Sequence, residues 1–177
     1  MKLGQLEVNL SELTEFIVKA KKNGYAGDGE KRREPDGSKT FIFQEGDFYY
    51  TDNYAGSYQA PGDEIVRWQR EDGQRIWHMA YSGGINPEFC GNGKIKELTL
   101  VFLKEALMLV DFKHPFRGPP IHENEDLKYV MEVGGNIRRF FGTEEIIDKE
   151  LNRPTFSQDF MGCLVIPEII TPKQSSQ

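Results

Sequence analysis

Apolar residues recur at helical spacing in two segments of the chain, 10–22 and 94–112. The apolar positions of the first segment are Leu10, Leu13, Phe16, Ile17 and Ala20. Asn9 stands where a helix cap is expected and Gly24 where a helix end is expected, so we predict an amphipathic helix between them. In the second segment, apolar residues surround a narrow polar stripe of Glu97, Lys104 and Asp111. So wide an apolar surface predicts a second helix that is buried on more than one side.

Alternation of apolar and polar residues predicts β-hairpins in both halves of the chain. In the first half, the alternating segments are 40–44 with 48–54 and 64–69 with 75–81, and a short turn containing glycine joins each pair. In the second half, the predicted strands are 128–133, 136–141, 144–149 and 155–160. Segments rich in Gly, Pro or charge are predicted to be exposed loops at 26–39, 86–93 and 115–124.

The two halves also resemble each other in sequence. The segment that begins at Tyr50 matches the segment that begins at Tyr129, and Gly62-Asp63-Glu64 matches Gly142-Thr143-Glu144. Each half therefore reads as a helix followed by strands. We predict that the chain is an internal duplication of one helix-plus-antiparallel-strands unit.

The length of 177 residues suits a single domain of ordinary size. We predict one domain over 1–177, with repeat halves at about 10–86 and 94–167 and a frayed tail at 168–177. The predicted fold class is α+β, in which an antiparallel sheet and two helices form one compact pseudo-twofold domain.

The charge and the cysteine content limit the binding partners and the cellular compartment that we expect. The net charge is −6 and the sequence pI is about 5.2, so we expect no direct binding to nucleic acid and none to a membrane, since phosphate contacts need clustered Lys and Arg. Two distant cysteines, Cys90 and Cys163, and the absence of a signal-like N-terminus favour the cytoplasm. Three widely spaced histidines and the lack of a nucleotide-binding fingerprint lead us to expect neither a metal nor a cofactor.

Comparison of the halves separates structural positions from candidate site positions. Glu64 and Glu144 follow matching glycines, so we predict that both carboxylates accept backbone N–H bonds in a turn, with a general-base role as the alternative. Polar residues found in one half only are better candidates for a site. Asp52 is one of these, because its counterpart is Met131. Among aromatic neighbours its carboxyl group should either find a hydroxyl partner or have a raised pKa.

These differences predict a ligand pocket in the first half. Its candidate residues are Asp52, Tyr54, Glu64, Trp77, His78 and Tyr81. Alternation along the strand puts Trp77 and Tyr81 on one face and His78 on the other, so the histidine can lie outside the pocket. The alternative is an ordinary aromatic core with one hydrogen-bonded aspartate and an exposed histidine.

Three motifs in the first half carry a family resemblance. They are Tyr50-x-Asp52-x-Tyr54-x-Gly56, then Gly62-x-Glu64, then Trp77-x-Met79-x-Tyr81-x-Gly83. This run resembles a family of small bacterial and archaeal proteins built on a domain of unknown function, some of which stand alone while others follow an Xre-type helix-turn-helix DNA-binding domain. The sequence departs from the family pattern at Pro61 and Ala80. The resemblance implies a sensory or ligand-binding module.

Three functional hypotheses follow. The leading one is a non-catalytic module that binds a small organic ligand in an aromatic pocket. The second is a hydrolase or lyase that uses Asp52 or Glu64 for proton transfer. The third is an interaction domain that forms a homodimer through the apolar second helix.

Overall fold

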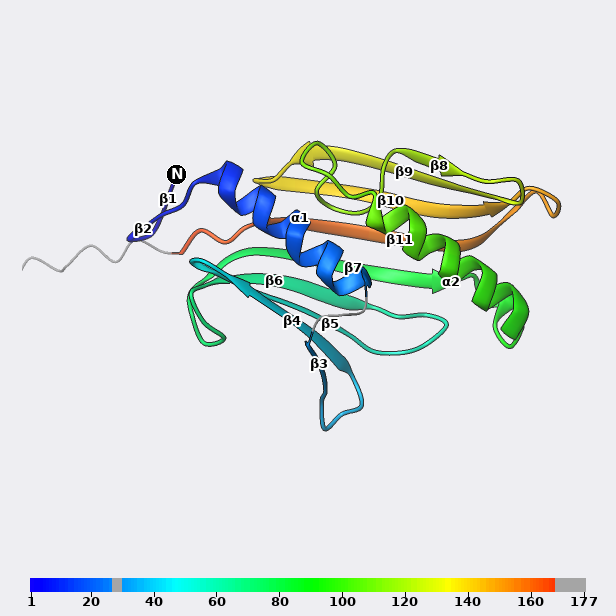
Figure 1. Ribbon diagram of the computed structural model, residues 1–177, viewed down its shortest axis with the longest axis horizontal. Coiled ribbons are helices and arrows are strands. Elements are labelled where there is room, and N and C mark those ends of the chain that lie inside the picture. The colour runs from blue at the N-terminus through cyan, green and yellow to red at the C-terminus, as the bar shows by residue number, and fades with distance from the viewer. Residues whose placement is uncertain (27–29, 168–177) are drawn as a thin grey trace, which may run out of the picture.

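The computed structural model describes residues 1–26 and 30–167. A large antiparallel sheet carries both helices, α1 (Leu10–Ala26) and α2 (Gly93–Met108), on the same face (Figure 1). The predicted α+β class is therefore confirmed at the level of two helices on a large antiparallel sheet. The predicted tail at 168–177 lies outside the described residues.

The nine strands of the sheet run in the order β3-β4-β5-β6-β7-β11-β10-β9-β8. Their bounds are β3 (Glu30–Arg33), β4 (Lys39–Glu45), β5 (Phe48–Tyr54), β6 (Gly62–Trp68), β7 (Arg75–Ile85), β8 (Ile121–Glu123), β9 (Leu127–Asn136), β10 (Arg139–Asp148) and β11 (Arg153–Leu164). Two short N-terminal strands, β1 (Lys2–Leu3) and β2 (Leu6–Glu7), pair with each other, and a 3-10 turn spans Pro87–Phe89. Both hairpins predicted in the first half are present.

Both helices begin where the sequence predicts but end elsewhere. The Asn9 side chain accepts a hydrogen bond from the Ser11 amide at the start of α1, and Asn92 caps α2 in the same way. Helix α1 runs past Gly24 to Ala26. This glycine makes room for the Phe41 ring against the helix, because an added Cβ would lie 3.1 Å from the ring. Helix α2 ends at Met108, before the predicted residue 112.

The second half contains fewer and longer main strands than predicted. The predicted strands 136–141 and 144–149 form the single strand β10, and Gly142 lies in its middle. A side chain there would be impossible, because an added Cβ would stand 2.4 Å from the Glu132 carbonyl oxygen and 2.5 Å from the Phe160 ring. The predicted break between two strands at Gly142 is therefore absent, and this glycine serves a close contact between strands. Two predicted loops also contain short edge strands, β3 and β8.

The register of the sheet relates the two halves. Gly62 pairs with Tyr81 in the first half, and Gly142 pairs with Phe160 in the second. Tyr81 and Phe160 also pair with each other, where β7 meets β11 at the middle of the sheet. The halves thus meet edge to edge in one continuous sheet.

The core lies between the helices and the sheet. Trp77 is fully buried, and its indole stacks on Phe140 with ring centroids 5.7 Å apart. Helix α2 buries one face only: Leu98 and Val101 remain 55% and 56% exposed. The expected burial of α2 on more than one side is therefore not found within a single chain. Among the described residues, no helix has the length and apolar character needed to cross a membrane.

Candidate functional site

The centre of the molecule holds a buried ion pair between α1 and the sheet. Lys21 of α1 donates a hydrogen bond to Glu64 Oε2 on β6, and neither side chain has any exposed surface. Burial is the largest influence on the Lys21 amine and lowers its pKa, because desolvation disfavours the charged form, while Glu64 acts in the opposite direction. The pair fixes the last turns of α1 over the middle of the sheet.

A second buried carboxylate, Glu144 on β10, is surrounded by donors. Arg117 donates from Nη2 over 2.7 Å and from Nε over 2.8 Å to Glu144 Oε1. Gln158 donates to the same oxygen over 2.9 Å, and the Tyr129 hydroxyl donates to Oε2 over 2.6 Å. This carboxylate has the multiple charge-assisted partners that a buried ion needs.

Arg117 connects the two carboxylates. Its Nη1 lies 3.9 Å from Glu64 Oε1, an oxygen for which no hydrogen-bond partner is found among the described residues. The prediction that Glu64 and Glu144 bind backbone amides in turns was wrong. Both lie inside strands, fully buried, and each is held by a cationic side chain: Lys21 of α1 for Glu64, and Arg117 of the segment between α2 and β8 for Glu144.

Asp52 on β5 adds a third carboxyl group beside this network. It pairs across the strands with Glu64, and its Oδ1 accepts a hydrogen bond of 2.6 Å from the Tyr81 hydroxyl. Burial is the main cause that raises the Asp52 pKa to about 7, and the neighbouring Glu64 charge adds to it. Sequence reasoning expected a hydroxyl partner or a raised pKa, and both are present. Burial and the Asp52 charge also raise the pKa of Tyr81.

Asp52 lies at the boundary between the buried network and a pocket of about 420 Å³. The pocket is enclosed by the end of α1, by one side of α2, by strands of the sheet and by the segment 56–60. Its lining comprises Gly24, Lys31, Lys39, Phe41, Asp52, Tyr54, Gly56, Ser57, Tyr58, Ala60, Tyr81, Gly84, Lys96, Leu100, Leu103, Leu107, Phe156 and Gln158. We call this space the Asp52 pocket.

The structure brings some of the predicted site residues together and separates others. Asp52, Tyr54 and Tyr81 all line the Asp52 pocket. Glu64 does not line it but stands beside Asp52 on the next strand. Trp77 is part of the core. His78 lies on the opposite face of the sheet, as alternation predicted, where its Nε2 is 3.4 Å from an Asp63 carboxylate oxygen.

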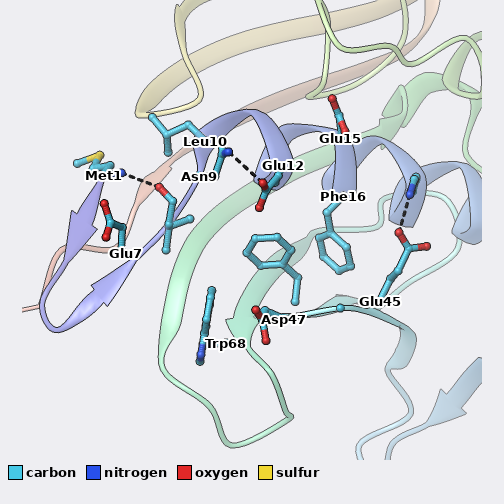
Figure 2. Close-up of a pocket in the computed structure, with 14 residues that line it drawn as sticks. Met1, Glu7, Asn9, Leu10, Glu12, Glu15, Phe16, Glu45, Asp47 and Trp68 are labelled. Carbon is cyan, nitrogen blue, oxygen red and sulfur yellow. Dashed lines mark hydrogen bonds and ion pairs between the residues drawn. The ribbon is translucent and has the colours of Figure 1, made fainter.

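A larger groove of about 770 Å³ lies beside the first turns of α1. Figure 2 shows Phe16 and Trp68 beneath it and several carboxylates around it, among them Glu12 and Glu45. Glu45 is paired with Lys19 over 2.5 Å, and the N-terminal amine donates to the Val8 carbonyl oxygen. The Glu45 carboxylate and the N-terminal amine of this groove therefore already have partners, and the groove shares no lining residue with the buried network.

Sequence reasoning missed several residues of the site, among them Lys21, Arg117 and Gln158. One signal was available for Lys21. It follows Ile17 by four positions and so falls on the apolar face of α1, where a lysine needs a buried acid as its partner. Arg117 lies in a segment between α2 and β8, outside any periodic pattern, and only the tertiary structure places it between two glutamates.

The fold and site define an α+β protein with a ligand-sized pocket beside a buried ionic network. A family model described as a domain of unknown function, DUF5680, matches residues 52–165, and the chain belongs to this family. The match includes Asp52, Glu64, Arg117, Glu144 and Gln158. A search of curated proteins and a search of solved structures each found no match.

Proposed function

We propose that this protein is a binding or sensory module whose Asp52 pocket takes a small organic ligand. The observation that carries the proposal is the position of Asp52: a carboxyl group with a raised pKa at the wall of a pocket of about 420 Å³. The volume falls within the usual range for small-molecule sites, in which apolar walls surround a few polar groups. Aspartate, tyrosine and glutamine provide those polar groups here.

The buried network supports the proposal because it makes the inner wall of the pocket rigid. Gln158 is held by Glu144, and Tyr81 is held by Asp52. The Arg117 guanidinium lies 5.5 Å from the centre of the Tyr81 ring, so the ring is fixed from a second side. Side chains that are held in this way can recognise a ligand with little loss of conformational entropy on binding.

The proposal is tested by filling the pocket. Leu100 lines it from α2 and is partly buried, so Leu100→Trp should occupy part of its volume. Leu98→Trp on the same helix is the matched control, because Leu98 is exposed and does not line the pocket. Native mass spectrometry of the purified proteins and an NMR screen of aromatic fragments should show binding to the wild type and to the control. Equal binding by Leu100→Trp would refute the proposed site.

A second candidate function is an acid–base enzyme, a hydrolase or lyase. The Asp52 pKa of about 7 favours it, because a general acid or base works best when its pKa lies near the working pH. Glu64 does not line the pocket, so proton transfer would rest on Asp52 alone. Asp52→Asn should then abolish turnover of a bound compound without preventing its binding. Retention of turnover by this variant would exclude the enzyme.

We further propose that the two halves arose by duplication. Two correspondences support this: the glycine in front of each buried glutamate pairs with an aromatic residue of the next strand, and the aromatic residues, Tyr81 and Phe160, pair with each other. After duplication, only the first half would have kept a carboxylate at the position of Asp52. The polar pocket would thus be a specialisation of one half.

Two further proposals concern the cellular compartment and the oligomeric state of the protein. Cys90 and Cys163 are both exposed and unpaired, which suits a reducing compartment such as the cytoplasm. The exposed Leu98 and Val101 of α2 support homodimerisation as an additional role. Light scattering that shows only monomer at high micromolar concentration would refute the dimer.

A further inference from the structure

The outer part of the Asp52 pocket is positively charged. Lys31, Lys39 and Lys96 line it, and the first two are exposed while Lys96 is half-buried. The Lys96 ammonium lies 4.4 Å from the centre of the Tyr58 ring, and Lys39 lies 5.7 Å from that of Tyr54. Both contacts hold a cation over an aromatic side chain that also lines the pocket.

The positive charge at the pocket is opposite in sign to the net charge of the whole chain. The protein carries a net charge of −6, yet among the residues that the structure describes the pocket is lined by three lysines and by one carboxyl group, that of Asp52. Lysines gathered at the mouth of a pocket attract anions and raise their local concentration. The mouth therefore favours a ligand with an anionic group.

The inner end of the pocket offers acceptors instead. Gln158 donates one amide N–H to the Glu144 carboxylate, which can only accept, and within the described chain no hydrogen bond occupies the amide oxygen of Gln158. Asp52 accepts from Tyr81 at Oδ1, and within the described chain no hydrogen bond occupies its Oδ2. Both oxygens can accept a hydrogen bond from a ligand, that of Asp52 when its carboxyl group is ionised.

Apolar and aromatic side chains separate these two ends. They are Phe41, Leu100, Leu103, Leu107 and Phe156, from β4, α2 and β11. Such walls favour an apolar, preferably planar, ligand body over a flexible polar one.

We infer that the ligand of the Asp52 pocket is an aromatic organic anion with an N–H or O–H donor at the end opposite its anionic group. The anion lies among the lysines, the aromatic body between α2 and the sheet, and the donor against Asp52 and Gln158. This inference rests on the proposed binding function and names its ligand class.

Three related probes test each end separately: indole-3-propionate, its neutral analogue indole-3-propanamide, and 1-methylindole-3-propionate, which lacks the N–H. NMR titration of the isotope-labelled protein detects even millimolar binding. We expect the first probe to bind about tenfold more tightly than either analogue, the size expected for one charge-assisted hydrogen bond. An amide or N-methyl analogue that binds as tightly as indole-3-propionate would overturn the inference.

Charge reversal at the mouth gives an independent readout. Lys96→Glu should weaken the binding of indole-3-propionate by about tenfold and leave the binding of indole-3-propanamide unchanged. Lys94→Glu is the matched control, since Lys94 lies on the same helix but does not line the pocket. An equal effect of the two substitutions would refute the role of the lysines.

The outcomes distinguish the inference from the proposed function. If all three probes bind equally and Leu100→Trp blocks them, the pocket binds ligands but the inferred class is wrong. If none of the probes binds, the inferred class is likewise wrong, and the fragment screen decides the proposed function. If the probes bind and Leu100→Trp leaves their binding unchanged, the pocket is not the site and both fail.

Discussion

Asp52→Asn should change how the stability of the protein depends on pH. In the folded protein the Asp52 pKa is raised to about 7, whereas the ordinary value of 3.8 applies to an unfolded chain. Between these two pH values the Asp52 carboxyl group keeps its proton in the folded state and has lost it in the unfolded state. Stability therefore falls as the pH rises, because the unfolded state binds fewer protons. Below the lower pH value the contribution of Asp52 to the stability of the protein is fully present, and above about pH 7 it is lost.

The expected size follows from the two pKa values. Raising the pH from about 5.5 to about 8 should remove about 2 kcal/mol of unfolding free energy through Asp52, since each unit of pKa difference corresponds to about 1.4 kcal/mol. The neutral amide of Asp52→Asn does not titrate, so the variant should lack this loss. Its stability relative to the wild type should therefore rise by about 2 kcal/mol over the same interval.

Urea denaturation of both proteins at the two pH values measures this difference. Asp159→Asn, an exposed substitution of the same kind on β11, is the control and should follow the wild type. Titrating groups distant from both substituted positions are common to all three proteins and cancel in the comparison. A wild type and an Asp52→Asn variant whose stabilities change in parallel with pH would refute the raised pKa, and with it the carboxylic acid at the pocket wall.

Three other substitutions test the network, the sheet and the helix surface. Glu144→Gln removes the buried negative charge that lies 2.7 Å from the Arg117 guanidinium, and we expect a loss of about 3–5 kcal/mol in urea denaturation. Gly62→Ala would place a Cβ 2.5 Å from the Tyr81 hydroxyl oxygen, so we expect about 1–3 kcal/mol of destabilisation and weaker probe binding. Val101→Glu puts a charge on the exposed apolar surface of α2, and we expect it to convert the proposed homodimer to monomer in light scattering.

Each of these expectations has a control and an outcome that contradicts it. Glu45→Gln breaks an exposed ion pair and should hardly change stability, so an equal loss in Glu45→Gln and Glu144→Gln would refute the importance of burial. Gly93→Ala meets open space at the start of α2 and should be tolerated; Gly62→Ala must not be. A wild type and a Val101→Glu variant with the same mass in solution would rule out α2 as the dimer surface.

Local patterns determine much of this fold. The apolar spacing of α1, its cap at Asn9 and the hairpins of the first half depend on residues close together in the chain, and the structure confirms them. Asp52 was also recognisable from the sequence, since a carboxylate that alternates with aromatic residues has few solutions other than a hydroxyl partner or a proton.

The errors around Gly142 and Glu144 have a common physical cause. Glycine in a sequence indicates either a turn or a close approach of another group, and the two cannot be told apart locally. The sequence left both readings open for Gly142, and the structure shows the second: this glycine sits inside β10, where the Phe160 ring occupies the space of a side chain. Glu144, two residues later, was predicted to lie in a turn but is buried in the core.

By itself, the sequence determined the fold class, the positions of the helices, the faces of the strands and the unusual character of Asp52. Only the tertiary structure decided which cation meets which carboxylate and where the pocket lies. Lys21 and Glu64 come together from α1 and β6, and Arg117 reaches Glu144 from an irregular segment. Periodicity reports which side of an element is buried, but not what lies opposite. The identity of a buried partner is set by the packing of helices on the sheet, through contacts distant in the chain.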